Sequence, residues 1–135
     1  MGLTTPQELQ KFAQGLSDCA DAFNERIKAE LTGGNISPEE AFLRLSKERL
    51  LREVANSLFL QAALKTINGL AESQANIDAA IGAAQAKIKS FQAFAKSLEL
   101  VADLIALGTA VFAGKLPPIV AALSEVKTDL APPAG

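Results

Sequence analysis

Histidine, tryptophan and tyrosine are all absent from this 135-residue chain. The missing histidine removes the side chain that most often moves protons near neutral pH and that most often binds transition metals. The missing tyrosine removes a further general acid. Catalysis by a nucleophile with an imidazole base is therefore excluded, as is a metal site of the Glu-x-x-His type in a helical bundle. We expect a protein that is not an enzyme, with no catalytic residue, no cofactor and no bound metal.

The chain also has little cysteine and a small net charge. Cys19 is the only cysteine, so no disulfide can form within the chain, and its apolar neighbours indicate a small buried side chain. The formal net charge is -2 at pH 7, which is a poor match for a nucleic-acid partner because such a partner requires a basic field. The basic run at 44–52 contains glutamates at helical spacing, which indicates a solvated helix face.

The first ten residues lack the basic start and the apolar run of a cleavable signal peptide. We therefore expect a soluble protein that is either cytoplasmic or exported without such a peptide. The length fits a single domain over residues 1–135.

Two short segments, TPQE at 5–8 and SPEE at 37–40, carry the same helix-start signal. In each, a hydroxyl side chain can accept a backbone N–H, proline takes the first helical position and a glutamate completes a capping box. These signals predict helices over about 6–32 and 38–67. The first carries one apolar stripe, whereas the second is apolar over a wider arc and is expected to lie between two neighbours. Residues 68–76 form either a turn or a kink in one long helix.

The third predicted helix, over about 76–113, has the most regular pattern. Its apolar positions follow steps of four and three residues: Ile77, Ile81, Ala84, Ile88, Phe91, Ala95, Leu98, Ala102 and Ile105. A polar stripe follows the same spacing and ends at Asp103. A continuous helix of this length would extend roughly 55 Å. We therefore expect an all-α fold, namely an elongated antiparallel bundle of three long helices with coiled-coil-like packing, a short helix at 118–129 and a tail at 131–135.

The apolar segment 104–123 contains one charged residue, Lys115. It fills helix directions that are polar one turn earlier, and Pro117 and Pro118 then break the helix. Monomeric proteins rarely expose an apolar surface of this size, so the segment needs cover. The candidate contact residues are Leu104, Leu107, Val111, Phe112, Leu116, Ile119 and Val120.

Three interpretations of this segment compete. It is the buried centre of the chain's own bundle, or it is the interface of a homo-oligomer or of a complex with another helical protein, or it acts on membranes. The expected function is protein–protein contact without catalysis, through self-association of 104–123.

The membrane interpretation has a limit in length. Only eleven uncharged residues separate Asp103 from Lys115, whereas a spanning helix needs about twenty, so a conventional transmembrane helix is excluded. An apolar hairpin over 98–123 could still insert when several copies assemble. This layout resembles that of helical pore-forming toxins over this segment, and the resemblance implies a hairpin that is hidden in the soluble oligomer. A coat on an apolar droplet or granule is a related alternative.

Overall fold

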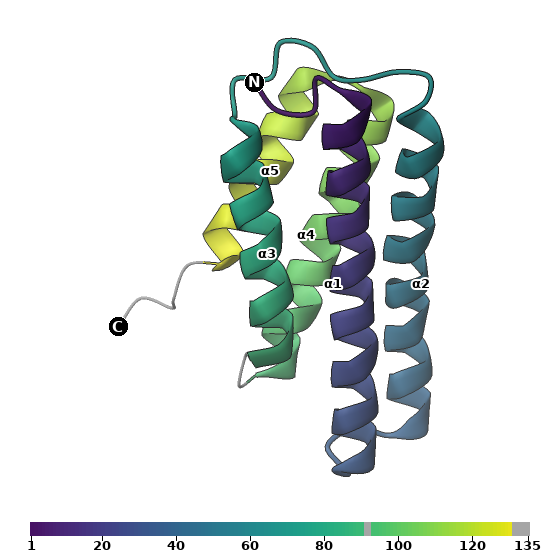
Figure 1. Ribbon diagram of the computed structural model, residues 1–135. Helices are drawn as coiled ribbons and strands as arrows, with labels where there is room; N and C mark the ends of the chain where they lie inside the picture. Colours follow the sequence, from purple (N-terminus) through teal and green to yellow (C-terminus); the bar gives the residue numbers. More distant parts are fainter. Residues whose placement is uncertain (91–92, 131–135) are drawn as a thin grey trace.

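The computed structural model describes residues 1–90 and 93–130 of the chain. Within these residues there are five α-helices and no strand: α1 (Pro6–Thr32), α2 (Pro38–Gln61), α3 (Gln74–Ser90), α4 (Phe94–Ala113) and α5 (Leu116–Leu130). Consecutive helices run in opposite directions, and the segment 62–73 crosses one end of the bundle from α2 to α3 (Figure 1). The all-helical class is thus confirmed, with five helices where four were expected.

The first two helices begin at their capping boxes. Thr5 Oγ1 accepts the Glu8 N–H at 3.1 Å, and Ser37 Oγ accepts the Glu40 N–H at 3.1 Å. Each glutamate side chain in turn accepts the backbone N–H of its capping residue at 3.2 Å. Both predicted helix starts are confirmed, and α1 ends at Thr32 as the glycine pair after it indicates.

The predicted second helix, 38–67, is too long, because α2 ends at Gln61. The residues that follow leave the helix to pack against the first residues of the chain. Ile67 N–H donates to the Leu3 carbonyl at 2.9 Å, and Gly2 N–H donates to the Glu72 carbonyl at 2.7 Å. Ile67 is buried by this arrangement, and 62–73 is a connection rather than a kinked helix.

The predicted helix over 76–113 is wrong, because the chain forms two helices there, α3 and α4. The rod of roughly 55 Å that a continuous helix would make does not form. Phe91, which belongs to the predicted apolar stripe, lies outside the described residues, as does the predicted tail at 131–135.

Side chains from two other helices complete the end of α3. Ser97 Oγ of α4 donates to the Ile88 carbonyl at 2.9 Å, and Arg26 Nη1 of α1 donates to the same carbonyl at 3.2 Å. Phe94, the first residue of α4, stacks on Phe23 of α1 with ring centroids 5.9 Å apart. These contacts replace the hydrogen bonds that a continuous helix would make at this point.

The break also changes which face of α4 is buried. The predicted stripe continues onto α4 at Ala95, Leu98, Ala102 and Ile105, which are exposed or half-buried. The residues that α4 buries lie on a different face: Ser97, Leu100, Val101, Leu104, Leu107, Gly108, Ala110 and Val111. This face still repeats at three and four residues, but its register differs from that of the buried face of α3.

The last helix turns back over α4 and α3. Gly114, in the left-handed region at φ 75°, ends α4, and α5 begins at Leu116, slightly earlier than expected. Pro117 and Pro118 lie in the first turn of α5, where a helix needs no backbone donor. The residues that α5 buries are Ile119, Ala122, Leu123 and Val126. α5 therefore covers a large part of α4, while α1 and α2 pack on its other side.

Candidate contact surface

Most of the predicted contact residues lie in the core of the chain. Leu104, Leu107, Val111 and Ile119 are buried, Leu116 is half-buried, and Phe112 and Val120 are exposed. α1 and α2 pack on one side of the α4 part of the apolar segment, 104–113, and α5, which begins within the segment, packs on another. The four buried residues are therefore not available as a contact surface, because their own bundle already occupies them.

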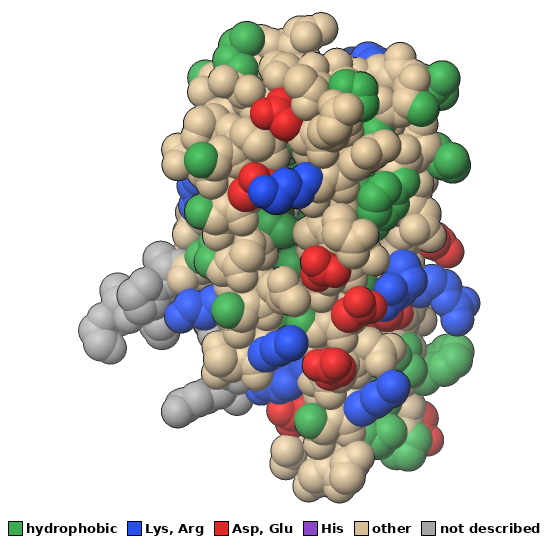
Figure 2. All heavy atoms as spheres, in the orientation of Figure 1, with side chains coloured by type: hydrophobic (Ala, Val, Ile, Leu, Met, Phe, Trp, Pro, Cys, Tyr) green, Lys and Arg blue, Asp and Glu red, His purple; other side chains and the backbone are tan. Residues whose placement is uncertain are grey.

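The exposed apolar side chains gather instead on α2 and on the residues just after it. In the described part of the chain, six of the ten large hydrophobic side chains that are exposed fall at 42–64: Phe42, Leu43, Leu45, Leu50, Leu60 and Leu64. Figure 2 shows hydrophobic side chains above and below a central group of basic and acidic ones along the α2 edge of the bundle. The wide apolar arc predicts that this helix lies between two neighbours, and α2 does pack on α1 and α4. Among the described residues part of the arc nevertheless faces outward.

A groove runs between α2 and the end of α4. One part of it has a volume of about 470 Å³, and the adjoining part has a volume of about 270 Å³. Both parts share Ser57 and Phe112. We call this the α2–α4 groove, with the apolar lining residues Leu50, Val54, Leu60, Leu64 and Phe112. Phe112 is thus the predicted contact residue that belongs to the α2 side of the molecule.

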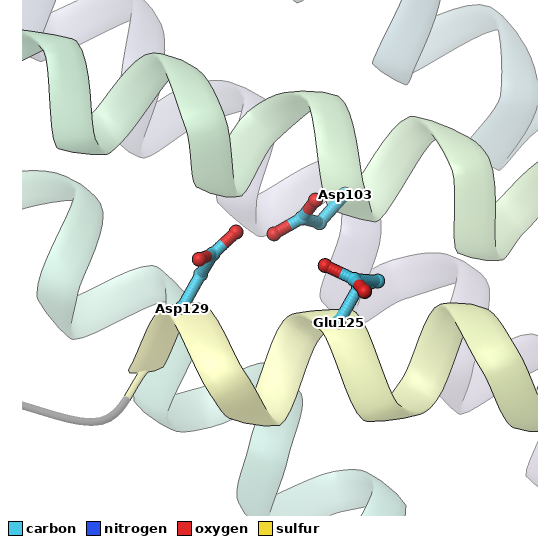
Figure 3. Close-up of side chains that lie close together, drawn as sticks. All are labelled: Asp103, Glu125 and Asp129. Atoms are coloured by element: carbon cyan, nitrogen blue, oxygen red, sulfur yellow. The ribbon is translucent and has the colours of Figure 1, made fainter.

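Three carboxylates meet between α4 and α5. Asp103 of α4 points toward Glu125 and Asp129 of α5 (Figure 3), and one oxygen from each lies within 4.8 Å of the others. Burial, together with the facing Asp129 and Glu125, raises the pKa of Asp103 to about 7. The sequence pattern places Asp103 at the end of the polar stripe of its own helix. The missed signal was the spacing of Glu125 and Asp129, which is one helical turn on the next helix.

This cluster does not identify a ligand. Acidic side chains are often close together on helix surfaces, and Glu125 is exposed. Oδ2 of Asp103 is buried and has no hydrogen-bond partner among the described residues, but the side chain as a whole is only half-buried. We interpret the cluster as a pH-sensitive contact between α4 and α5.

Cys19 is buried in α1, as its apolar neighbours indicated. Burial raises the pKa of its thiol to about 12, with a smaller contribution from the charge of Asp18. Sγ lies 3.7 Å from the Ile81 carbonyl oxygen, to which the thiol donates. A protonated and enclosed thiol is a packing residue rather than a nucleophile.

Comparisons with models of protein families, with curated proteins and with solved structures found no match. Among the helices of residues 1–90 and 93–130, none has both the length and the apolar character that crossing a bilayer requires. The function is therefore inferred from the surface of this chain.

Proposed function

We propose that this chain acts by protein–protein contact, without catalysis, and that it self-associates through the outward face of α2 and the α2–α4 groove. The observation that carries this function is the exposure of Phe42, Leu60 and Leu64, whose exposed fractions are 71%, 75% and 88%. Burying one such side chain fully contributes about 1.5–3 kcal/mol. Association of two such faces would remove several of them from water at once.

A second copy of the chain is the partner that these features favour. The α2 face carries both basic and acidic side chains among its apolar ones, and the net charge of the chain is -2, so two copies repel only weakly. Oligomers of identical chains most often use a two-fold interface in which one face meets its own copy. An exposed face at the edge of the bundle, as α2 is, can meet that requirement without obstruction from other helices (Figure 1).

A second candidate function is association with a bilayer through the α4–α5 hairpin. The observation that favours it is the position of Phe112 and Val120, which are both exposed and lie on either side of the turn at Gly114. Deeper insertion of the hairpin over 98–123 would require α4 to leave its contacts with α1 and α2. The loss of the buried α4 core would oppose that step.

Sedimentation equilibrium over low micromolar to millimolar concentrations tests self-association. We expect the wild-type mass to rise with concentration, and a variant with Phe42→Ser and Leu60→Ser to remain monomeric. Val120→Ser is the control. Val120 is an exposed apolar residue, as Phe42 and Leu60 are, but it lies on α5. This control should behave as the wild type does.

A wild-type chain that stays monomeric at millimolar concentration contradicts self-association. Leakage of dye from lipid vesicles, measured on the same samples, separates the two functions. Leakage that Val120→Ser suppresses and the α2 variant does not would favour the hairpin and count against the α2 face.

A further inference from the structure

The outward face of α2 carries a stripe that is symmetric about its own centre. Its members follow steps of four, three, four, three and four residues, and all are exposed: Phe42, Ser46, Arg49, Glu53, Asn56 and Leu60. We call these six residues the α2 stripe. Steps of this kind keep side chains in one line along a helix. The stripe therefore faces a single direction, away from α1 and α4.

The symmetry lies in the kinds of side chain at matching distances from Leu51, which is buried beneath the stripe. Phe42 and Leu60 are each nine residues away and are both apolar. Arg49 and Glu53 are each two residues away and have opposite charges. Ser46 and Asn56, five residues away on either side, are both polar and uncharged.

A two-fold axis at Leu51 would make this stripe complementary to itself. Two antiparallel copies of α2 would place Phe42 against Leu60 of the second copy and Arg49 against Glu53 of the second copy. A parallel arrangement would instead place Arg49 against Arg49, and like charges that meet across an interface oppose association. The order of the charges therefore selects the antiparallel arrangement.

The two central charges are available for such a contact. Neither Arg49 nor Glu53 forms an ion pair with another residue in the described part of the chain. Arg52, one helical turn after Arg49, differs in this respect, because it already forms ion pairs with Glu48 and Asp21. Within one α2, Arg49 precedes Glu53 by four residues, which is the less favourable order for a pair along a helix.

We propose that two copies of this chain pair through the α2 stripe, antiparallel about a two-fold axis at Leu51. This inference rests on the proposed self-association and adds the residues, the direction and the symmetry of the contact. From Phe42 to Leu60 the stripe extends about 27 Å at 1.5 Å per residue. A contact of one helix on another is small beside the roughly 800 Å² per partner of a standard interface, so the dimer should be weak, with a dissociation constant on the order of micromolar or above.

Charge reversal at the two central positions tests the arrangement. In a homodimer of the Arg49→Glu variant, the introduced glutamate of each copy would face Glu53 of the other copy. In a homodimer of the Glu53→Arg variant, Arg49 of each copy would face the introduced arginine of the other copy. Each variant should dimerise about tenfold or more weakly than the wild type, since two ion pairs are lost and two repulsions are added. An equimolar mixture of the two variants should recover the dimer, because each mixed pair joins a glutamate to an arginine.

Lys47→Glu is the matched control, because it makes the same change of charge on an exposed residue of α2 outside the stripe. It should leave the dissociation constant close to that of the wild type. A single chain with both Arg49→Glu and Glu53→Arg should also regain the homodimer. Helical circular dichroism and melting of each variant check that the fold is kept, and the double variant remains informative if one single variant folds poorly.

The outcomes separate this inference from the proposed function. A wild-type dimer that persists in both single variants, or a mixture that stays monomeric, overturns the antiparallel α2 contact and leaves self-association by another face. A wild type that is monomeric at millimolar concentration overturns both. Mutual rescue in the mixture, with Lys47→Glu unaffected, supports the contact as stated.

Discussion

Gly108 lies where α4 packs tightly against side chains of α2 and α1, and its replacement by alanine should weaken the fold. A Cβ at this position would overlap Val54 Cγ1 of α2 and would lie 3.0 Å from Leu16 Cδ1 of α1. Gly82 on α3 is the matched control, because a Cβ there meets nothing within 4 Å. Both glycines lie inside helices, so the two substitutions differ chiefly in packing.

The two substitutions should change the free energy of unfolding in opposite directions. Alanine is better than glycine inside a helix by about 1 kcal/mol, and Gly82→Ala should show this gain in full. At Gly108, overpacking costs about 1–3 kcal/mol, because Val54 is branched at Cβ and rotates little. The net result for Gly108→Ala should be a loss of about 1 kcal/mol.

Unfolding in urea, followed by the helical circular dichroism signal, measures both effects. The midpoint should rise for Gly82→Ala and fall for Gly108→Ala, with no change in slope, since the fold and its buried surface are kept. Val54→Ala in the Gly108→Ala background should recover part of the loss. If Gly108→Ala were as stabilising as Gly82→Ala, the close approach of α4 to α2 would not exist.

Three further outcomes are expected. The free energy of unfolding should fall as pH rises from about 4 to about 7, because folded Asp103 keeps a proton that the unfolded chain releases. Asp103→Asn should remove this dependence and gain about 1 kcal/mol above neutral pH, a value reduced for solvent screening since the side chain is half-buried; urea titrations across pH check both. Leu107→Glu should abolish cooperative thermal unfolding because it puts a carboxylate in the core, whereas Phe112→Glu should still melt cooperatively. Cys19 should resist alkylation in the native chain and react only as urea unfolds it, and a fast native reaction would contradict its burial.

The starts of α1 and α2 were predictable because each one depends on three or four adjacent residues. Thr5 and Glu8, or Ser37 and Glu40, complete their capping boxes without help from the rest of the chain. The end of α3 depends on Arg26, which is 62 residues distant from the carbonyl that it reaches. No glycine or proline marks that corner, so a pattern confined to one helix could not reveal it.

Four of the predicted contact residues, Leu104, Leu107, Val111 and Ile119, lie in the core for a related reason. The apolar segment 104–123 was recognised as needing cover, but periodicity does not say which helix supplies it. α5 supplies part of that cover itself, and Ile119 lies buried there. The exposed face of α2 could not be recognised from the sequence either. An apolar arc has the same sequence pattern whether another helix or water lies against it.

The corner between α3 and α4 also bears on the order in which the chain folds. Two carbonyl groups at the end of α3 obtain a donor from Arg26, and Phe94 at the start of α4 obtains a stacking partner from Phe23, both on α1. α1 and α2 are adjacent in sequence, so their mutual contacts need only a short loop to close. The contacts at this corner require α1 to be packed against α3 and α4, so we expect them to form with or after the docking of α1.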